Sequence, residues 1–315
     1  MYLDLLLSAL GQGVIYAPMA LGVFVAFRIL NTPDLTIDGS FVFGMTVCAA
    51  VTVAGHPIPA IFAGVLAGSA AGLMTGALQT VFGVNPILSG ILTLTGLYTV
   101  NYMVLGGQSN LYLQSWEPNA AGALVPVGSQ TIYKMMATVM GKSQSAALLL
   151  SLLITFLAAA ILIVFFKTRP GMAVRATGDN EEMVRSSSIN ADAARIGGIM
   201  IANALVALSG AILCQQQRYA DLGSGSGMLV VGLASVIIGQ ALFRQSSVTL
   251  GIISAVAGSI IYRLILQVAY QIDMPSHMVK LLSALIVTIA LILPQAKDKL
   301  AIMRLRHGGE RSQSR

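Results

Sequence analysis

Two aspartates, Asp34 and Asp38, interrupt the apolar sequence near the N-terminus in the segment LNTPDLTIDGSF. Pro33 ends any helix before them, and Asp38, Gly39 or Ser40 could cap the helix that follows. Carboxylates at membrane depth are costly, so their presence there would indicate a function. At a membrane surface they would belong to an ordinary solvated loop, and the sequence leaves both interpretations open. The polar candidates for a functional site here are Asp34, Asp38, Ser40 and, further along the chain, Asn85.

A second polar segment, GMAVRATGDNEEMVR at residues 171–185, lies between two long runs without charge. Asn180 and the two residues before it predict a turn or a helix cap. Glu181 and Glu182 then suit the positive end of a short helix. Such a helix has little to bury of its own, so Val184 and the methionine before it need a partner surface. The alternative is a solvated connector whose arginines only set topology.

The sequence contains no catalytic or metal-binding constellation. His56, His277 and His307 are far apart, and no H-x-x-x-H, C-x-x-C or G-x-S-x-G motif occurs. A G-x-x-x-x-G-K-[ST] motif is also absent, so any ATP must be hydrolysed on another polypeptide. We therefore predict that the chain is not an enzyme and binds no metal or cofactor itself. Cys48 and Cys214 lie in apolar runs and are expected to be buried and unbridged.

The composition indicates a protein that crosses a membrane several times. Of the 315 residues, 56% are hydrophobic and 10% are charged, and the mean hydropathy is +0.81. Uncharged apolar runs of about 18 residues or more recur, each long enough to cross about 30 Å of hydrocarbon as a helix. The net charge of +6 comes from the loop after Phe166 and the C-terminal tail. This is the distribution expected of cytoplasmic flanks, and it gives no support to nucleic-acid binding.

The expected fold is an all-α, polytopic membrane helical bundle of about eight to ten transmembrane helices. A transmembrane domain of residues 1–296 contains a cytoplasmic loop at 167–195 and precedes a basic cytoplasmic tail at 297–315. An odd number of crossings places the N-terminus outside. Residues 107–143 would form an external loop with a short helix near 131–140. The predicted spans lie near residues 5–27, 41–54, 58–83, 86–105, 145–166, 196–216, 229–243, 248–271 and 277–295.

Glycines recur every four residues along the third predicted span, and they fall on one face of a helix. A glycine face lets another helix approach closely, which favours packing over solute contact as its role. The second predicted span is shorter than the roughly 20 residues needed to cross, so part of the segment before it is expected to enter the membrane as non-helical backbone. The glycines concerned are Gly64, Gly68, Gly72 and Gly76.

A weak internal repeat relates two parts of the chain. Ala-Gly-Ser begins a similar stretch at Ala67 and at Ala257, and each stretch leads through a proline corner into a new span. Upstream of each lies a short span preceded by a Gly/Ser turn, at Asp38 and at Gly223. Counting the predicted membrane crossings shows that the two copies run in opposite directions. Inverted repeats of this kind are common in transporters, where the solute path lies at their interface.

Two motifs resemble those of ABC importer permeases of the ribose and branched-chain amino acid type. The first is GMAVRATGDNEEMVRSSSIN, which is similar to their cytoplasmic coupling loop. The second, PDLTIDGSF, is similar to the Asp-Leu-Thr-Val-Asp-Gly-Ser-Phe form found in permeases paired with tryptophan/tyrosine-type binding proteins. The resemblance covers about residues 10–295. Ser188 stands where the family usually has glycine, and Val184 where it usually has alanine.

The resemblance implies a permease subunit of the bacterial inner membrane that moves a small solute, such as an amino acid, delivered by an extracytoplasmic binding protein. Its partners would be membrane lipid, a second permease copy and separate ATPase subunits that hold ATP and Mg²⁺. The candidate residues of its solute path are Asp34, Asp38, Ser40 and Asn85. The residues that the resemblance assigns to the ATPase-coupling element are Gly178, Asn180, Glu181, Glu182, Val184, Arg185, Ile189 and Asn190.

Three alternatives stay open on the sequence alone. An ion-coupled secondary transporter or channel fits inverted repeats and a broken helix equally well, although it would need an ionisable group at mid-membrane that most of the spans lack. The solute could also be a sugar or a nucleoside instead of an amino acid. A membrane enzyme would need a nucleophile and a base, and no such pair is visible.

Overall fold

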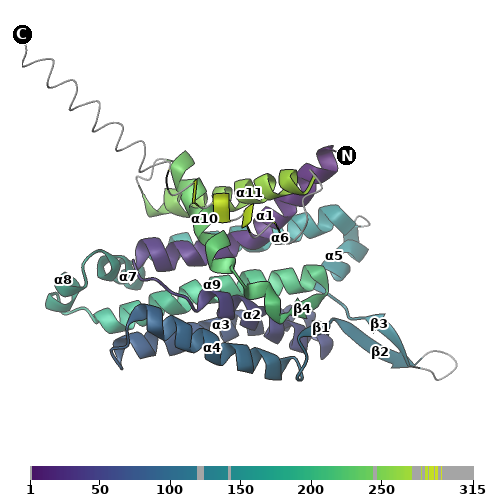
Figure 1. Ribbon diagram of the computed structural model, residues 1–315, viewed down its shortest axis with the longest axis horizontal. Helices are drawn as coiled ribbons and strands as arrows, with labels where there is room; N and C mark the ends of the chain where they lie inside the picture. Colours follow the sequence, from purple (N-terminus) through teal and green to yellow (C-terminus); the bar gives the residue numbers. More distant parts are fainter. Residues whose placement is uncertain are drawn as a thin grey trace, which may run out of the picture.

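A computed structural model describes residues 2–118, 124–140, 143–243 and 247–271, together with scattered residues between 278 and 292. Long helices run side by side along the length of the molecule (Figure 1). They are α1 (Tyr2–Phe24), continued by the π-helical turn η1 (Val25–Ile29), α2 (Ile37–Val53), α3 (Pro57–Thr80), α4 (Pro86–Val104), α6 (Ser143–Lys167), α9 (Ala191–Gln217), α10 (Met228–Leu242) and α11 (Val248–Gln271).

The two ends of the bundle carry different short elements. At one end, called the α8 end here, lie α7 (Arg169–Asp179) and α8 (Glu181–Ser186) (Figure 1). At the other, called the hairpin end, lie the strands and α5 (Ile132–Met140), which begins one residue into the short helix predicted near 131–140. The strands are β1 (Asn110–Tyr112), β2 (Gln114–Pro118), β3 (Leu124–Gly128) and β4 (Tyr219–Asp221), followed by a 3-10 turn, η2 (Leu222–Gly225).

The helical membrane bundle predicted from the sequence is confirmed. Seven helices of the described residues are long and apolar enough to cross a membrane, and α2 is a shorter apolar helix of 17 residues. The predicted boundaries differ from the observed ones by at most five residues; the largest difference is at α9, which begins at 191 instead of 196. The ninth predicted span, 277–295, lies largely outside the described residues, as does the tail at 297–315.

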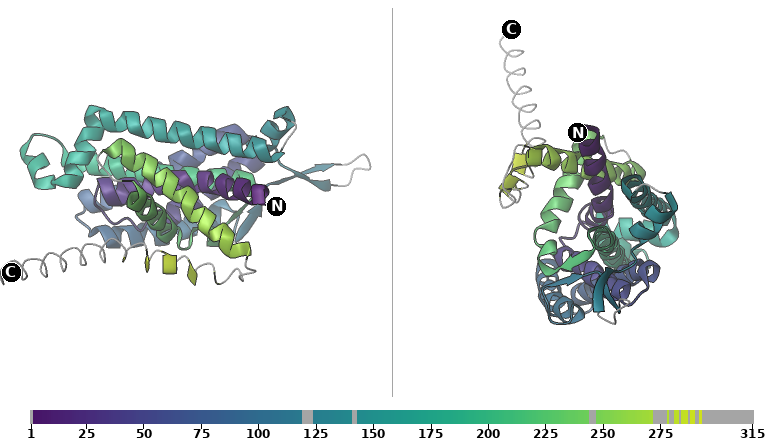
Figure 2. Two further views of the ribbon diagram at one scale, coloured as in Figure 1. Left: turned by 90° about the horizontal axis from the view of Figure 1, so that it is seen from above. Right: turned by 90° about the vertical axis from the view of Figure 1, so that its right-hand side faces the viewer.

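Helix α9 is the centre of the bundle, and its neighbours run in defined directions. Ser40 of α2 hydrogen-bonds Asn203 and Thr52 hydrogen-bonds Gln215, so α2 runs parallel to α9. Helix α1 runs the other way, because Ile15 accepts a hydrogen bond from the Ser209 hydroxyl of α9 and Gly22, later in α1, packs against Ala202, earlier in α9. In an end-on view α4 and α6 lie at the periphery (Figure 2), and both expose large apolar side chains, as lipid-facing or partner-facing helices do.

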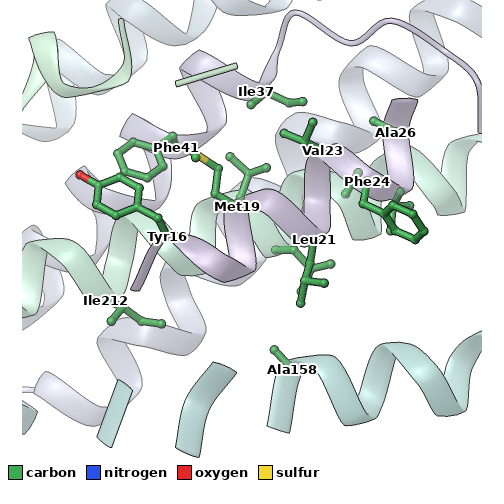
Figure 3. Packing of buried hydrophobic residues seen from close by; sticks show 14 of the residues in the cluster. Tyr16, Met19, Leu21, Val23, Phe24, Ala26, Ile37, Phe41, Ala158 and Ile212 are labelled. Atoms are coloured by element: carbon green, nitrogen blue, oxygen red, sulfur yellow. The ribbon is translucent and has the colours of Figure 1, made fainter. Parts of the chain in front are cut away.

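Large apolar side chains of α1 and α2 form the core beside α9 (Figure 3). Tyr16 stacks on Phe41 with ring centroids 6.1 Å apart, and the guanidinium carbon of Arg263 lies 3.5 Å from the centroid of the Tyr16 ring. Arg263 belongs to the span α11, so this cation–π contact places a charge within the membrane region. This arginine was not predicted to have a role, because it stands alone in an apolar run.

The first and last parts of the bundle are arranged as an inverted pair of helix triplets. Helices α1, α2 and α3 are long, short and long, and so are α9, α10 and α11. The contacts of α10 with α11, and of α11 with α1, show that each member of one triplet is antiparallel to its counterpart. Helices α2 and α10 are the short members, and both begin inside the bundle. The sequence predicted opposite directions for the part around α2 and α3 and the part around α10 and α11, which agrees with this arrangement; the span at 277–295 that would end the second copy lies largely outside the described residues.

Two small sheets at the hairpin end were not predicted. Strand β1 pairs antiparallel with β4, with Leu111 opposite Ala220, and β2 pairs with β3 in a hairpin. Strands this short leave little periodicity to read in a sequence, and β1 and β4 are more than 100 residues apart. Their backbone hydrogen bonds join the segment after α4 to the segment after α9.

The four glycines of α3 lie where this helix comes closest to its neighbours. A Cβ atom at Gly64 would lie 2.8 Å from the carbonyl oxygen of Gly44, and one at Gly72 would lie 2.7 Å from that of Ile199. Gly68 faces Ala207, and a Cβ at Gly76 would lie 3.1 Å from the Cα of Ile196. Contacts with backbone atoms leave no room for a side chain, so small residues are required along this face.

We expect Gly72→Ala to lower the stability of the protein by about 1–3 kcal/mol, because the new methyl group meets the backbone of α9. Gly197→Ala is the matched control, since a Cβ there meets none of the described residues within 4 Å. Alanine is the better helix former, so the control should be neutral or stabilising by up to about 1 kcal/mol. Thermal unfolding of the purified variants in detergent measures both, and equal midpoints would contradict the packing role.

Candidate functional site

Asp38 joins the starts of the two short helices. It lies in the first turn of α2, and its carboxylate accepts hydrogen bonds from the backbone N–H groups of Gly227 at 3.1 Å and Leu229 at 2.7 Å. These groups begin α10. The prediction that Asp38, Gly39 or Ser40 caps α2 is therefore wrong: α2 begins at Ile37, its N-cap position makes no side-chain bond, and Asp38 caps a helix far away in the sequence.

Asp34 and Ser40 form a second polar cluster with Asn203 of α9. The Asn203 side-chain amide donates to Asp34 at 2.7 Å, and the Ser40 hydroxyl donates to the Asn203 carbonyl oxygen at 2.6 Å. Asp34 also accepts from the backbone N–H of Thr36 at 2.8 Å, and the Thr36 hydroxyl meets that of Thr75 at 2.7 Å. All of these side chains are fully buried. The cluster therefore fixes the non-helical segment before α2 and presents no free group to a solute.

A cavity of about 580 Å³ opens beside Asp38. Its size suits a small solute, and most of its surface is apolar with a few polar groups, as is usual for binding sites. Asn101 at its wall is held by the Thr46 hydroxyl, which donates to it at 3.1 Å. The lining residues are Asp38, Gly39 and Val42 of α2, Leu94, Thr95, Tyr98, Thr99 and Asn101 of α4, and Leu222, Gly223, Gly225 and Ser226 before α10.

The structure separates the four candidate residues of the solute path. Asp38 lines the cavity, whereas Asp34 and Ser40 lie behind it in the buried cluster. Asn85 caps α4 by accepting from the N–H of Ile87 at 3.0 Å, and it is exposed at the α8 end. Asn101, which the sequence analysis did not select, lies 16 residues further along α4, about 24 Å away along the helix axis. Its signal was a lone amide in an apolar run.

The polar segment at residues 167–195 contains two helices where one was predicted. Helix α7 begins after Thr168, and α8 begins after Asn180, whose side chain accepts from the N–H of Met183 at 3.0 Å. Asn190 caps α9 in the same way through the N–H of Ala193. Gly178 lies within α7 instead of in a turn, packed against the carbonyl of Ile29. The segment is thus a folded element docked on the end of α1.

An ion-pair network fixes the orientation of α8 relative to α9. Arg185 pairs with Asp192 and with Glu181, at 2.8 Å for the latter, and Arg195 pairs with Glu181 at 3.0 Å. The pKa of the Arg185 guanidinium is raised above its ordinary value, mainly by the hydrogen bonds to Asp192 and next by those to Glu181. Each exposed pair contributes little by itself, but together they join α8 to the first turn of α9.

The two faces of α8 differ in what they offer to a partner. Val184 is 1% exposed and packs inward, whereas Met183 is 53% exposed and Ile189 is 42% exposed. Glu182 is also exposed. Ser188 has a φ of 59°, a left-handed conformation that favours glycine, and this is the position where the resembling family usually has glycine. The outward apolar surface of the segment therefore comes from Met183 and Ile189, while Val184 holds the helix to its own bundle.

The described residues contain no group of three or more His, Cys, Asp or Glu side chains that could hold a metal ion. Cys48 and Cys214 are buried and unbridged, as predicted. A polar contact that sequence reasoning missed lies near the hairpin end. There the side-chain amide of Gln215 donates to the Thr52 hydroxyl at 2.7 Å, and its oxygen accepts from the N–H of Ile132 at 3.1 Å.

A helical membrane bundle with two inverted triplets, short helices that begin at its centre and a cavity at their meeting point defines a class: the membrane transport proteins. Over residues 5–291 the chain matches the family described as "Branched-chain amino acid transport system / permease component", and it belongs to that family. It is the permease subunit of an ABC importer of amino acids, a multi-pass protein of the bacterial inner membrane and not itself an enzyme.

Two curated relatives cover nearly the whole chain. The "Tyrosine transport system permease protein" of Clostridioides difficile (strain R20291) is 33% identical over 283 residues, which are 90% of this chain and 88% of that protein. An uncharacterized protein of Rickettsia prowazekii (strain Madrid E) is 27% identical over 300 residues, 94% of this chain and 100% of that protein. No solved structure matches the chain.

We expect Asp38→Ala to destabilise the protein by about 1–2 kcal/mol, because two backbone N–H groups at the start of α10 lose their acceptor, and that of Leu229 is partly buried. Asp38→Asn keeps one acceptor oxygen, so its loss should be smaller. The free energy of unfolding in detergent, from denaturant or thermal titration, compares the two variants. A protein that is as stable with alanine as with aspartate would show that the carboxylate does not hold the junction.

Proposed function

We propose that this chain conducts an aromatic amino acid through the cavity beside Asp38. The observation that carries the proposal is the cavity itself, which lies where the two short helices meet and is mainly apolar. Tyr98 offers a ring to an aromatic solute, while Thr95 and Thr99 offer hydroxyls. The printed name of the relative that is 33% identical supports this substrate class.

We propose further that the importer contains two copies of this permease, with the solute path along the interface between them. Helix α4 supports this arrangement, because it carries both the lining of the cavity and a large exposed apolar face. Leu88, Leu92 and Tyr102 belong to that face and are 50%, 51% and 42% exposed. A second copy lying on α4 would cover these side chains and close the open side of the cavity.

The α8 end is proposed to face the cytoplasm, and the hairpin end to face the binding protein. Basic residues support this orientation, since Lys167, Arg169 and Arg175 all lie at the α8 end. Separate ATPase subunits, holding ATP and Mg²⁺, would then dock on α7 and α8. Met183 and Ile189 would enter a groove of the ATPase, and the capped, ion-paired α8 would transmit its movement.

The contacts within the permease suggest how such a movement reaches the cavity. Arg185 joins α8 to the start of α9, and Asn203 in the middle of α9 joins that helix to Asp34 and Ser40. A displacement of α9 is therefore passed to the start of α2, where Asp38 lies. Because Asp38 also holds the start of α10, both short helices would move together and change the opening of the cavity.

The substrate proposal predicts different effects for aromatic residues on two different helices. Tyr98→Leu should lower the uptake of tyrosine about two- to tenfold, the scale of a lost ring–ring contact. Phe156→Leu is the control, because Phe156 is 69% exposed on the peripheral helix α6 and does not line the cavity. Uptake is measured in proteoliposomes with the ATPase and the binding protein. Equal uptake by the two variants would exclude the cavity as the path.

The docking proposal predicts that Met183→Asp weakens co-purification of the ATPase at least tenfold, since a carboxylate would be buried in an apolar groove. Met135→Asp is the control, because Met135 is 41% exposed on α5 at the opposite end of the molecule. The permease's own thermal midpoint should stay unchanged in both variants. Unimpaired binding and coupled ATP hydrolysis in Met183→Asp, or uptake without any ATPase, would overturn this assignment.

A further inference from the structure

A second cavity lies at the α8 end, away from the solute path. It has a volume of about 380 Å³ and lies between the end of α1, helix α7 and the start of α11. Its walls are of two kinds. Arg28, Arg175, Asp179 and Ser247 supply polar groups, and Phe24, Ile29 and Val248 supply apolar surface. None of these residues lies beside Asp38, so the cavity needs an explanation of its own.

No acid of the described residues forms an ion pair with either arginine of this cavity. Asp179 is the single acidic residue in the lining, beside Arg28 and Arg175. By contrast, Arg185 and Arg195 nearby are both paired. Two unpaired guanidinium groups beside one carboxylate leave a net positive cavity, which favours an anion with several acceptor oxygens.

The position of the cavity indicates that the anion is part of a lipid and not free in solution. The apolar span Leu6–Ile29 ends at it, and the span Val248–Ala269 begins at it, so it lies at the depth where hydrocarbon gives way to headgroups. Phe24, Ile29 and Val248 form the apolar part of its wall, and elsewhere on its surface α11 exposes Leu250 and Ile253, by 37% and 48%. Acyl chains can cover such a surface, whereas a free anion gains nothing from it.

We propose that this cavity binds the phosphate of an anionic phospholipid headgroup. Arg28 and Arg175 would hold the phosphate oxygens, the Ser247 hydroxyl would donate to one of them, and the acyl chains would lie along α11. Basic pockets between transmembrane helices on the cytoplasmic side are recognised sites for such headgroups. Because the lipid would touch α1, α7 and α11 together, it would fix α7, and through it the docking segment, to the membrane surface.

The test uses the full-length protein in nanodiscs that contain phosphatidylglycerol and phosphatidylcholine. Native mass spectrometry measures how far bound phosphatidylglycerol exceeds its share of the nanodisc lipid. The excess should fall about fivefold for Arg28→Gln or Arg175→Gln, the scale of one basic side chain at an anionic surface, and further for the double variant. Asp179→Asn should raise it, because a repelling carboxylate is removed.

The matched control is the double variant Lys167→Gln, Arg169→Gln, which removes the same charge from exposed residues of the same end that do not line the cavity. If the control lowers the excess as much as the cavity variants do, general surface charge explains the effect and the proposal fails. The proposal also fails if inorganic phosphate binds the detergent-purified protein at this site while phosphatidylglycerol shows no excess, because the ligand is then a free anion.

A last outcome separates the lipid from a protein partner. If Arg28→Gln and Arg175→Gln weaken ATPase binding but leave the phosphatidylglycerol excess unchanged, the arginines belong to the ATPase interface and the lipid proposal is overturned. The lipid measurement needs neither ATPase nor solute. It can therefore fail while the proposed solute path holds, and it can hold while the proposed solute path fails.

Discussion

The arrangement of this permease depends on one carboxylate between two helix ends. Helices α2 and α10 both begin inside the bundle, and each helix start carries a partial positive charge and backbone N–H groups without partners. Two such ends repel each other, and unpaired amides are expensive where water is scarce. Asp38 belongs to the first turn of α2 and accepts from the amides of α10, so it serves both ends.

The same junction explains why the buried polar residues of the bundle are placed as they are. Because α2 and α10 begin inside the bundle, the backbone before each of them is not helical and cannot form hydrogen bonds within itself. Side chains from other segments must therefore hold it. Asn203 and Asp34 do this for the segment before α2, and Thr36 and Thr75 attach it to α3. The glycine face of α3 lets that helix approach α9 closely enough for these bonds to form. Packing and polar contacts therefore depend on each other here.

The sequence predicted the parts of the structure that repeat along a helix. Long apolar runs gave the spans, the short run after Asp38 indicated a helix that begins within the membrane, and Gly64 to Gly76 marked a packing face. Partners far apart in the chain could not be predicted from a single sequence. Asp38 caps α10 from 189 residues away, as its bond to Gly227 shows, and nothing in the spacing of its own segment identifies that amide.

Orientation on a short helix was also beyond sequence reasoning. Met183 and Val184 are adjacent apolar residues, and only the packed structure shows that Val184 points inward and Met183 outward. Arg263 and Asn101 were missed for a related reason: a single polar residue in a span has no pattern, and its meaning comes from the Tyr16 ring or the cavity that it meets. Family resemblance identified the segment, but the geometry assigns its faces.

The pairing of β1 with β4 has a mechanical consequence. These strands connect the two inverted halves by backbone hydrogen bonds at the hairpin end, with Asn110 opposite Asp221 and Tyr112 opposite Tyr219. Shearing such a ladder breaks several bonds at once, whereas rotation about it breaks none. The strand pair thus couples the segment after α4 to the segment after α9: neither can slide along the other unless the ladder breaks.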